Sequence, residues 1–340
     1  MVDAFCLFFI AKELIIYNLI TNTMEIEDKY PEIVQDVSNF YSKNPNGILV
    51  IRGATATGKS KLSILLAKDI PSEIISADSR QIFRYMNIGT DKVSLEIRNQ
   101  IPHYQINIVD PDQTYTAWQR KQDTQKHINQ ILNNEKLPIV VWWTGLYIDT
   151  LYKNFSLPES APNRELRKEL EEKEKQEPWY LHKELTKIDP EEAQKMHPNS
   201  LRYLIRALEI FYTTWKTKTE GFFQQPVEQP LFLLWLRREK EETNRKINAR
   251  IKQMFQEWLI DEVNWLLKKW YKPDLQSMQW IGYKEIIGYL QWEYDREKAE
   301  ELLKRNTHHL AKKQRTRFRR YVAEGKTSPK HNVTYKTYYL

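Results

Sequence analysis

The chain has 340 residues, of which 41% are apolar, enough for a sizeable core in two domains or in one domain with a large insertion. Its single cysteine, Cys6, excludes an internal disulfide framework, and no Cys/His cluster has zinc-site spacing, which favours a reducing cytoplasm. The net charge of +7 is local: residues 304–330 hold ten Lys and Arg against one acid, while the rest holds 42 basic and 44 acidic residues. This excess indicates a phosphate-backbone contact, or a solvated helix face.

Residues 1–45 are predicted to form an N-terminal extension. The apolar run 5–11 is too short to cross a bilayer and follows an acid, Asp3, so we expect no signal peptide and no membrane anchor. The first 23 residues are either a loosely packed helix or not native to the protein, because a more conventional polar segment begins at Met24.

The segment Gly53–Ser60, which reads GATATGKS, matches the phosphate-loop pattern G-x-x-x-x-G-K-[ST] at every fixed position. A buried strand at 48–51 and a helix at 61–68 flank it in the required order. The glycines let backbone N–H groups turn toward an anion, and the helix N-terminus and a lysine add positive charge. The final serine is placed to hold Mg²⁺. The predicted phosphate-binding residues are Gly53, Thr55, Ala56, Thr57, Gly58, Lys59 and Ser60, with Ser60 the magnesium ligand.

Three further strands are predicted at 73–77, 137–141 and 231–236, which gives an α/β fold built on a parallel sheet. In such a sheet, ligands lie at the carboxyl ends of the strands. Asp78 follows the second strand and is a candidate general base or metal ligand, with a helix N-cap as the alternative. Thr144 follows the third strand and is a second polar group at the same edge.

Helical segments make up most of the remainder. A densely charged insertion bounded by prolines spans 158–198, between a first part of the core (46–157) and a second part (199–325) that a tail (326–340) follows. In the predicted helix 199–213, Arg202 and Arg206 lie one turn apart and can face one anion. The C-terminal region is predicted to be helical at 240–269, 283–290 and 296–322.

Several stretches together resemble the tRNA dimethylallyltransferase (isopentenyltransferase) family, over nearly all of residues 46–322. They are Gly53–Ser60, Ser76–Ser79, Thr144–Tyr147, Arg206–Glu209, Gln279–Glu285 and Leu310–Thr316. The resemblance implies a core like that of the P-loop NTPases. It also implies transfer of a five-carbon isoprenyl group from dimethylallyl diphosphate to N6 of the adenosine 3′ of a tRNA anticodon, and we expect the enzyme to be a monomer.

The resemblance also assigns roles to residues. Asp78 is the expected general base, and Thr144 is expected to contact the diphosphate and the metal. Lys59, Ser60, Mg²⁺ and Arg206 are expected to stabilise the leaving diphosphate. The expected tRNA contacts are Asp78, Ser79, Arg80, Gln81, Arg167, Arg202, Arg206, Gln279, Gly282, Tyr283, Lys284, Lys312, Lys313, Arg315 and Arg319.

Three alternatives remain open at this point. An enzyme that prenylates free AMP, ADP or ATP needs the same loop and base but no long basic surface. A small-molecule kinase would consume ATP and would share only the phosphate loop. A tRNA-binding protein without activity would bind tRNA yet release no diphosphate.

Tryptophan stands where glycine is expected. The family strand end reads Gly-Gly-Thr-Gly, but here it is Trp142-Trp143-Thr144-Gly145. Trp215 and Trp270 follow helix ends that favour a left-handed glycine, and Trp258 and Trp292 look similar. The chain has nine glycines, far below the roughly 24 of an average share, and eleven tryptophans. One hypothesis is that UGA codons for glycine were translated as tryptophan; the alternative is a Trp-rich divergent or inactive homologue.

Overall fold

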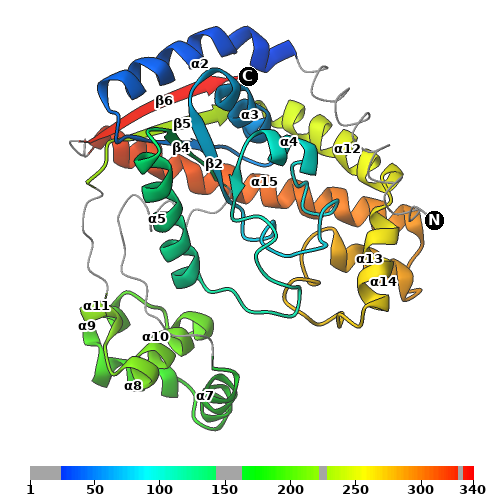
Figure 1. The fold of residues 1–340 in the computed structure, drawn as a ribbon. Coiled ribbons are helices and arrows are strands. Elements are labelled where there is room, and N and C mark those ends of the chain that lie inside the picture. Colours follow the sequence, from blue (N-terminus) through cyan, green and yellow to red (C-terminus); the bar gives the residue numbers. More distant parts are fainter. Residues whose placement is uncertain (1–23, 143–162, 222–227, 328–331) are drawn as a thin grey trace. The chain divides into compact units, whose positions relative to one another are not determined.

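A parallel six-stranded sheet forms the centre of the computed structural model, which describes residues 24–142, 163–221, 228–327 and 332–340 (Figure 1). The strand order is β3-β2-β4-β1-β5-β6, and every pair is parallel. The strands are β1 (Ile48–Arg52), β2 (Ser72–Ala77), β3 (His103–Tyr104), β4 (Leu137–Trp142), β5 (Leu231–Arg237) and β6 (Val333–Tyr339). All four predicted strands are present, and the predicted α/β class is confirmed.

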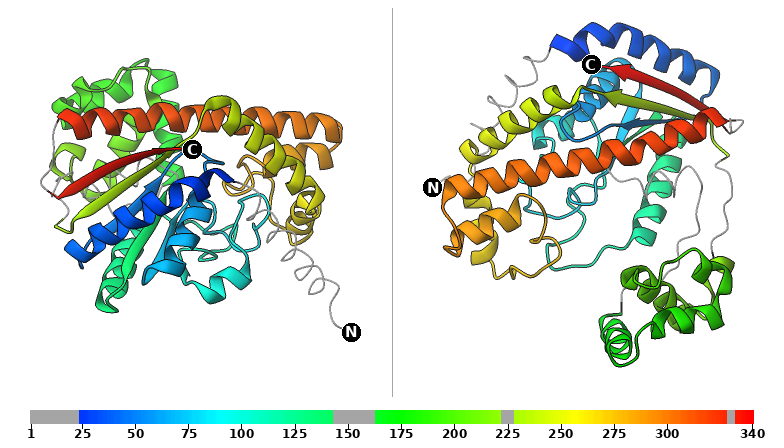
Figure 2. Two further views of the ribbon diagram at one scale, coloured as in Figure 1. Left: turned by 90° about the horizontal axis from the view of Figure 1, so that it is seen from above. Right: turned by 180° about the vertical axis from the view of Figure 1, so that it is seen from behind.

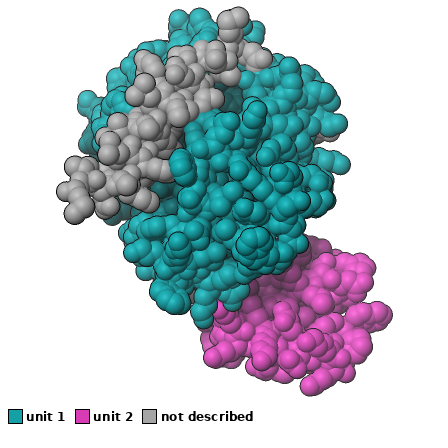
Figure 3. Space-filling view, turned by 90° about the vertical axis from the view of Figure 1, so that its right-hand side faces the viewer, with its two compact units in different colours: residues 1–115, 123–145, 228–340 teal, residues 116–122, 146–227 magenta. Residues whose placement is uncertain are grey.

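The chain divides into two compact units, coloured separately in Figure 3. The larger unit comprises residues 1–115, 123–145 and 228–340, and the smaller unit comprises residues 116–122 and 146–227. The helices between residues 24 and 133 are α2 (Met24–Lys43), α3 (Lys59–Asp69), α4 (Leu95–Gln100) and α5 (Ala117–Asn133). Those of the smaller unit after residue 146 are α7 (Arg164–Gln176), α8 (Tyr180–Ile188), α9 (Pro190–Gln194), α10 (Leu201–Thr214) and α11 (Lys218–Gly221). The C-terminal helices are α12 (Lys240–Gln256), α13 (Leu259–Lys268), α14 (Tyr283–Leu290) and α15 (Arg296–Thr327).

Both faces of the sheet are covered, which explains why its central strands are mostly apolar. All five residues of β1 are buried. Leu49 and Ile51 pack in one cluster with residues of α2 and α3, and Figures 1 and 2 show α15 running along the opposite face. The carboxyl ends of β1, β2, β4 and β5 therefore open at one edge, where the chain continues into the phosphate loop and the other predicted site segments.

The predicted N-terminal extension and C-terminal tail are both part of the larger unit. α2 buries Ile33, Val37 and Phe40 in the main core. β6 pairs with β5 along its whole length, and the buried Tyr338 donates a hydrogen bond to Asp36 of α2. The prediction of a tail was wrong here because the alternating β-branched and aromatic residues of β6 form an edge strand. Residues 1–23 lie outside the described part of the chain.

The smaller unit extends beyond the predicted insertion boundary at residue 198. Residues 146–227 belong to one compact unit, so α10 with Arg202 and Arg206 is part of this unit and not of the second part of the core. The reason is packing: Leu204 and Leu208 of α10 share a buried cluster with Leu170 of α7.

The long helix predicted at 240–269 is broken in two. α12 ends at Gln256 and α13 begins at Leu259, with Trp258 between them in the left-handed conformation at φ +72°. Trp215 and Trp270 also have positive φ, +56° and +67°, as expected at these helix ends. No helix in the described residues is both long enough and apolar enough to cross a bilayer.

We predict that Tyr338→Ala lowers the free energy of unfolding by about 3–5 kcal/mol, because it removes a buried ring and its hydrogen bond to α2. The matched control is Tyr339→Ala, whose ring is 57% exposed, with an expected loss below about 1 kcal/mol. Urea unfolding of both variants measures the difference, and equal losses would show that β6 does not belong to the core.

Candidate active site

The phosphate loop joins β1 to α3 and leaves no space for side chains at its two glycines. A Cβ at Gly53 would lie 2.6 Å from Thr57 Oγ1 and 2.8 Å from the Leu236 carbonyl oxygen. Gly58 has φ +91°, and a Cβ there would lie 2.4 Å from Ile26 Cδ1. Close packing and the left-handed backbone explain why the motif needs glycine at both positions.

Lys59 lies buried inside this loop, and its Nζ donates to the Ala54 carbonyl oxygen at 2.7 Å. Burial is the main cause that lowers the pKa of Lys59 to about 7, and the nearby charge of Arg250 lowers it further. The carboxylates of Asp78 and Asp91 act in the opposite direction. Lys59 therefore lies in a place where an added anion would favour its charged form.

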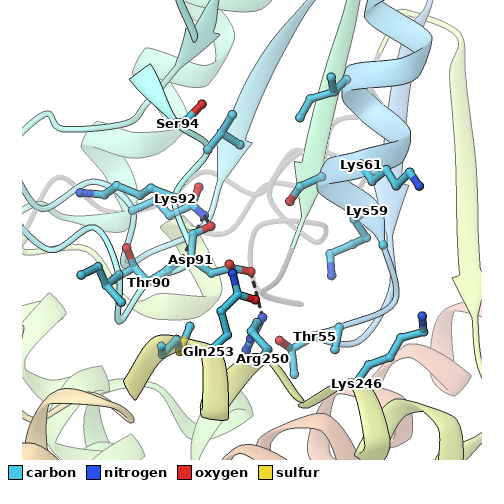
Figure 4. Close-up of a pocket in the computed structure, with 18 of the residues that line it drawn as sticks. Thr55, Lys59, Lys61, Thr90, Asp91, Lys92, Ser94, Lys246, Arg250 and Gln253 are labelled. Atoms are coloured by element: carbon cyan, nitrogen blue, oxygen red, sulfur yellow. Dashed lines mark hydrogen bonds and ion pairs between the residues drawn. The ribbon is translucent and has the colours of Figure 1, made fainter. Parts of the chain in front are cut away.

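A cavity of about 460 Å³ opens beside the loop (Figure 4). Its wall comes mainly from the phosphate loop with α3, the segment Thr90–Ser94, and α12 with Arg238. Residues of α2, α4 and the segment between β2 and Thr90 complete it. Figure 4 shows Lys59 directed into the cavity and Arg250 ion-paired to Asp91 on the opposite side, with 3.0 Å between Nη1 and Oδ2. The exposed Ser60 also lines the cavity.

Positive charge is concentrated in this cavity. Besides the lysines of the loop, Arg238, Lys246 and Arg250 contribute to the lining. Burial lowers the pKa of Lys246 first, and the charge of Arg238 lowers it further. Cations that destabilise one another within a low-dielectric pocket form a site for a ligand with several negative charges. Sequence reasoning missed these three residues because they come from separate, unremarkable stretches that only the fold brings together.

The cavity wall opposite the loop is held by Glu262 of α13. Its carboxylate accepts hydrogen bonds from the backbone N–H groups of Asn87 and Ile88 at 2.8 Å and of Gly89 at 3.1 Å. The hydroxyl of the fully buried Tyr283 donates to the same carboxylate at 2.7 Å. Glu262 thus fixes the segment that leads into Thr90 and Asp91, a role that no sequence motif indicated.

Asp78 is 4% exposed and follows β2 at the ligand edge of the sheet. Its Oδ1 accepts a hydrogen bond from the Arg80 backbone N–H at 2.7 Å, which closes a turn. No helix begins here, so the alternative of a helix N-cap does not hold. The negative charge of this carboxylate acts on Lys59 and partly offsets the lowering of the lysine pKa by burial.

Two of the predicted tRNA segments meet on the surface. The guanidinium of Arg80 lies 4.1 Å from the ring centroid of Trp280. In the sequence, Trp280 stands between Gln279 and Lys284, and both of these side chains are exposed. Ser79 is half-buried in the same turn. The exposed groups of these segments therefore form one patch.

Besides Asp78, three predicted tRNA contacts in these segments are buried, namely Gln81, Gly282 and Tyr283. Tyr283 has no exposed surface. Gln81 donates to the carbonyl oxygens of Thr90 and Asp91 at 3.2 Å and accepts from Ser76. Both residues support the surface and the cavity from within. Gly282 begins α14 with φ +105°, a conformation that explains the glycine.

On α15, Lys312 and Lys313 are exposed as the charge pattern predicted. Arg315 differs, because it lines a small cavity of about 30 Å³ beneath the phosphate loop together with Ala54 and Thr57. Its guanidinium faces the interior because this side of α15 packs on the loop. The side chain of Arg319 lies outside what the structure describes, as does Thr144.

In the smaller unit, Arg167 and Arg206 share one buried carboxylate. Glu209 accepts from Arg167 Nε at 2.8 Å and Nη2 at 2.7 Å, and from Arg206 Nη1 at 2.5 Å. Burial alone would raise the pKa of Glu209, but these hydrogen bonds lower it. Arg202 is exposed on the same helix. The pairing fixes two predicted tRNA-binding guanidinium groups side by side.

The side chains at the cavity would suit a magnesium ion that takes most of its ligands from a bound substrate. Within the described ranges, no group of three His, Cys, Asp or Glu side chains could hold a metal ion. Ser60 nevertheless presents an exposed hydroxyl in the phosphate-binding cavity. Mg²⁺ commonly takes one or two protein ligands and fills its remaining positions with phosphate oxygens and water.

A parallel sheet, a complete phosphate-loop motif at its carboxyl edge and a cation-lined cavity define an α/β protein of the P-loop class. The family model described as IPP transferase matches residues 81–321, and the chain belongs to this family. A tRNA dimethylallyltransferase from Halothermothrix orenii is 46% identical over 290 residues, which cover 83% of this chain and 87% of the relative.

Solved structures of tRNA-modifying transferases also match this chain. A full-length tRNA isopentenylpyrophosphate transferase from Bacillus halodurans matches with a TM-score of 0.58 and 35% identity, covering 86% of this chain and 90% of its own. A eukaryotic dimethylallyltransferase acting on tRNA matches with a TM-score of 0.69 and 27% identity, covering 86% of this chain and 73% of its own.

We predict that binding of inorganic diphosphate at pH 8 takes up a proton at Lys59. With a pKa of about 7 the free side chain is mostly neutral at pH 8, and the bound anion favours its charged form. Calorimetry in two buffers of different ionisation enthalpy measures the uptake. The wild type should take up close to one proton more than Lys59→Met; equal uptake by both would contradict the assigned pKa.

Proposed function

We propose that the chain is a tRNA dimethylallyltransferase that moves a dimethylallyl group from dimethylallyl diphosphate to N6 of the adenosine 3′-adjacent to the anticodon. The observation that carries this proposal is the cavity in which Lys59 of the phosphate loop faces Arg250, with Ser60 also in the lining. It joins a site for several negative charges to an apolar wall, and the relatives named above are tRNA-modifying transferases.

The cavity suits both halves of this donor. Its volume of about 460 Å³ falls in the range of small-ligand sites. The cations would hold the diphosphate. The apolar lining would hold the five-carbon chain and consists of Ile26, Ile64, Ile88, Val93, Ile97 and Met254.

The reaction forms a bond between N6 and C1 of the dimethylallyl group while the bond from C1 to the diphosphate oxygen breaks. The electron pair leaves with the diphosphate, and the N6 proton passes to the carboxylate of Asp78. Lys59 and Arg250 stabilise the negative charge that grows on the leaving group, which is a larger effect in a cavity that excludes water. Magnesium, held by Ser60 and the phosphate oxygens, would add Lewis-acid stabilisation there.

Asp78 must reach the amine within about 2.6–3.2 Å, which requires the target adenosine to leave its stack. Arg80 on Trp280, with Lys284 beside them, provides a cationic and aromatic surface next to this base. Lys312 and Lys313 extend the positive charge along α15 for backbone phosphates. In the smaller unit, the paired Arg167 and Arg206 would serve the same purpose, so a role of Arg206 at the diphosphate stays a prediction.

We predict that Asp78→Asn lowers transfer to an anticodon stem-loop by about 10²–10⁴-fold while the stem-loop affinity changes less than a few-fold. Asparagine keeps the oxygen that accepts from Arg80 but is not basic, so the turn stays intact. Mass spectrometry of the stem-loop measures transfer, and filter binding measures affinity. A fully active Asp78→Asn enzyme would remove Asp78 from the role of base.

A further inference from the structure

Tryptophan occupies the left-handed backbone conformation far more often than its chemistry explains. The structure describes the backbone of ten tryptophans, and five have positive φ: Trp179 (+69°), Trp215 (+56°), Trp258 (+72°), Trp270 (+67°) and Trp292 (+64°). All the other described non-glycine residues together supply six. The five indoles are between 53% and 91% exposed. A large apolar side chain is therefore both strained and solvated at each position.

Three of these positions show the hydrogen bonds of glycine-ended helices. The Trp215 N–H donates to the Phe211 carbonyl oxygen at 2.7 Å, four residues back. After α13, the Trp270 N–H donates to Leu267 at 3.0 Å, and the following N–H reaches Leu266. After α14, the Trp292 N–H donates to the carbonyl oxygen three residues back, and the next N–H donates to the carbonyl oxygen five residues back, as after α13. Helices that end in these motifs most often carry glycine at the left-handed residue.

Other described tryptophans have ordinary backbones and side chains that contact a neighbouring residue. Trp235 lies buried in β5, with the Arg52 guanidinium 5.2 Å from its ring centroid. Trp265 packs on Tyr85 with 5.3 Å between ring centroids. Trp280 stacks against Arg80. These eight described tryptophans therefore form two groups: five have a left-handed backbone and an exposed indole, and three have an ordinary backbone and a side chain that packs on a neighbour.

We infer that Trp179, Trp215, Trp258, Trp270 and Trp292 are glycines in the native protein, encoded by UGA codons that its cell reads as glycine. UGA differs from the tryptophan codon UGG in one base, so translation with UGA as tryptophan places indoles where glycines belong. The inference also explains why the sequence is poor in glycine, with nine residues, and rich in tryptophan, with eleven. The structure adds Trp179 to the positions that the sequence pattern indicates.

The gene sequence tests this inference directly. TGA codons are expected at the five left-handed positions, and TGG codons at 235, 265 and 280. TGG at the five positions would overturn the inference, as would TGA at all eight, because the backbone would then not distinguish the two groups. Mass spectrometry of tryptic peptides from native protein provides the second readout, with glycine expected at the five positions.

Stability provides a test of the physical reason. Trp270→Gly is expected to raise the thermal midpoint and Trp270→Ala to raise it less, since both remove the same exposed indole but only glycine adopts positive φ without strain. All five glycine substitutions together should raise the midpoint by roughly 5 °C or more. Trp235→Gly, at a buried position, is the matched control and should lower it. Equal midpoints for the glycine and alanine variants, or a lower midpoint for the five-glycine protein, would contradict the inference.

A second, independent observation concerns Gln314 on α15. Its buried carboxamide oxygen accepts a hydrogen bond from the Thr55 backbone N–H in the phosphate loop at 2.9 Å, across 259 residues of sequence. The neighbouring Lys312 and Lys313 are exposed on the basic surface of the same helix. One turn of α15 therefore contacts the phosphate loop on one side and presents cations on the other.

On the basis of the proposed function, we propose that Gln314 is a positioning residue that holds the phosphate loop in its diphosphate-binding shape. The N–H groups of such a loop bind the anion only when their directions are fixed. Gln314 fixes the third residue of the loop, so its loss should affect the diphosphate and not the tRNA.

Calorimetry with inorganic diphosphate and filter binding with an anticodon stem-loop separate these effects. Gln314→Met should weaken diphosphate binding by about tenfold and leave stem-loop affinity within twofold. Gln314→Glu, which keeps an acceptor but adds a negative charge beside the loop, should also weaken diphosphate binding. Lys313→Met is the matched control and should weaken only the stem-loop. Unchanged diphosphate affinity in either Gln314 variant would overturn this role, whereas a wild type that binds no stem-loop would contradict the proposed function instead.

Discussion

The structure depends on positive charge that the fold gathers around one cavity, which six Lys and Arg side chains and two carboxylates line. Lys59 lies inside the phosphate loop, and Arg238, Lys246 and Arg250 close around the same cavity. The pKa of Lys59 is lowered to about 7, first by burial and then by Arg250. A site of this kind costs stability until an anion enters it, which is the usual sign of a binding site built for charge.

The rest of the fold keeps these charges in place. The parallel sheet brings the phosphate loop, Asp78 and the end of β5 to one edge, although β5 ends more than 150 residues after the other two in the chain. Glu262 holds the facing wall through three backbone N–H groups, and Gln314 holds the loop. These hydrogen bonds fix the two facing walls of the proposed diphosphate site, and electrostatic catalysis requires groups that are positioned in advance.

Local patterns in the sequence predicted most of the fold and part of the site. The glycine motif predicted the phosphate loop because its spacing is imposed by backbone geometry, and four apolar runs predicted four strands. The edge strand β6 was missed although its residues alternate, because it lies in a segment interpreted as a tail. Arg250, Lys246 and Glu262 could not be found, since long-range packing alone brings them to the cavity. Tyr283 and Arg315 were predicted on the tRNA surface but face inward.

The most direct test of the function is a competition in one reaction. Labelled dimethylallyl diphosphate is offered to the enzyme with equal concentrations of an anticodon stem-loop and of AMP, ADP and ATP, and the products are separated by chromatography. Label is expected in the stem-loop, at N6 of the adenosine after the anticodon, and in no free nucleotide. Label in a free nucleotide with an unmodified stem-loop would contradict the assignment and make the protein a nucleotide prenyltransferase.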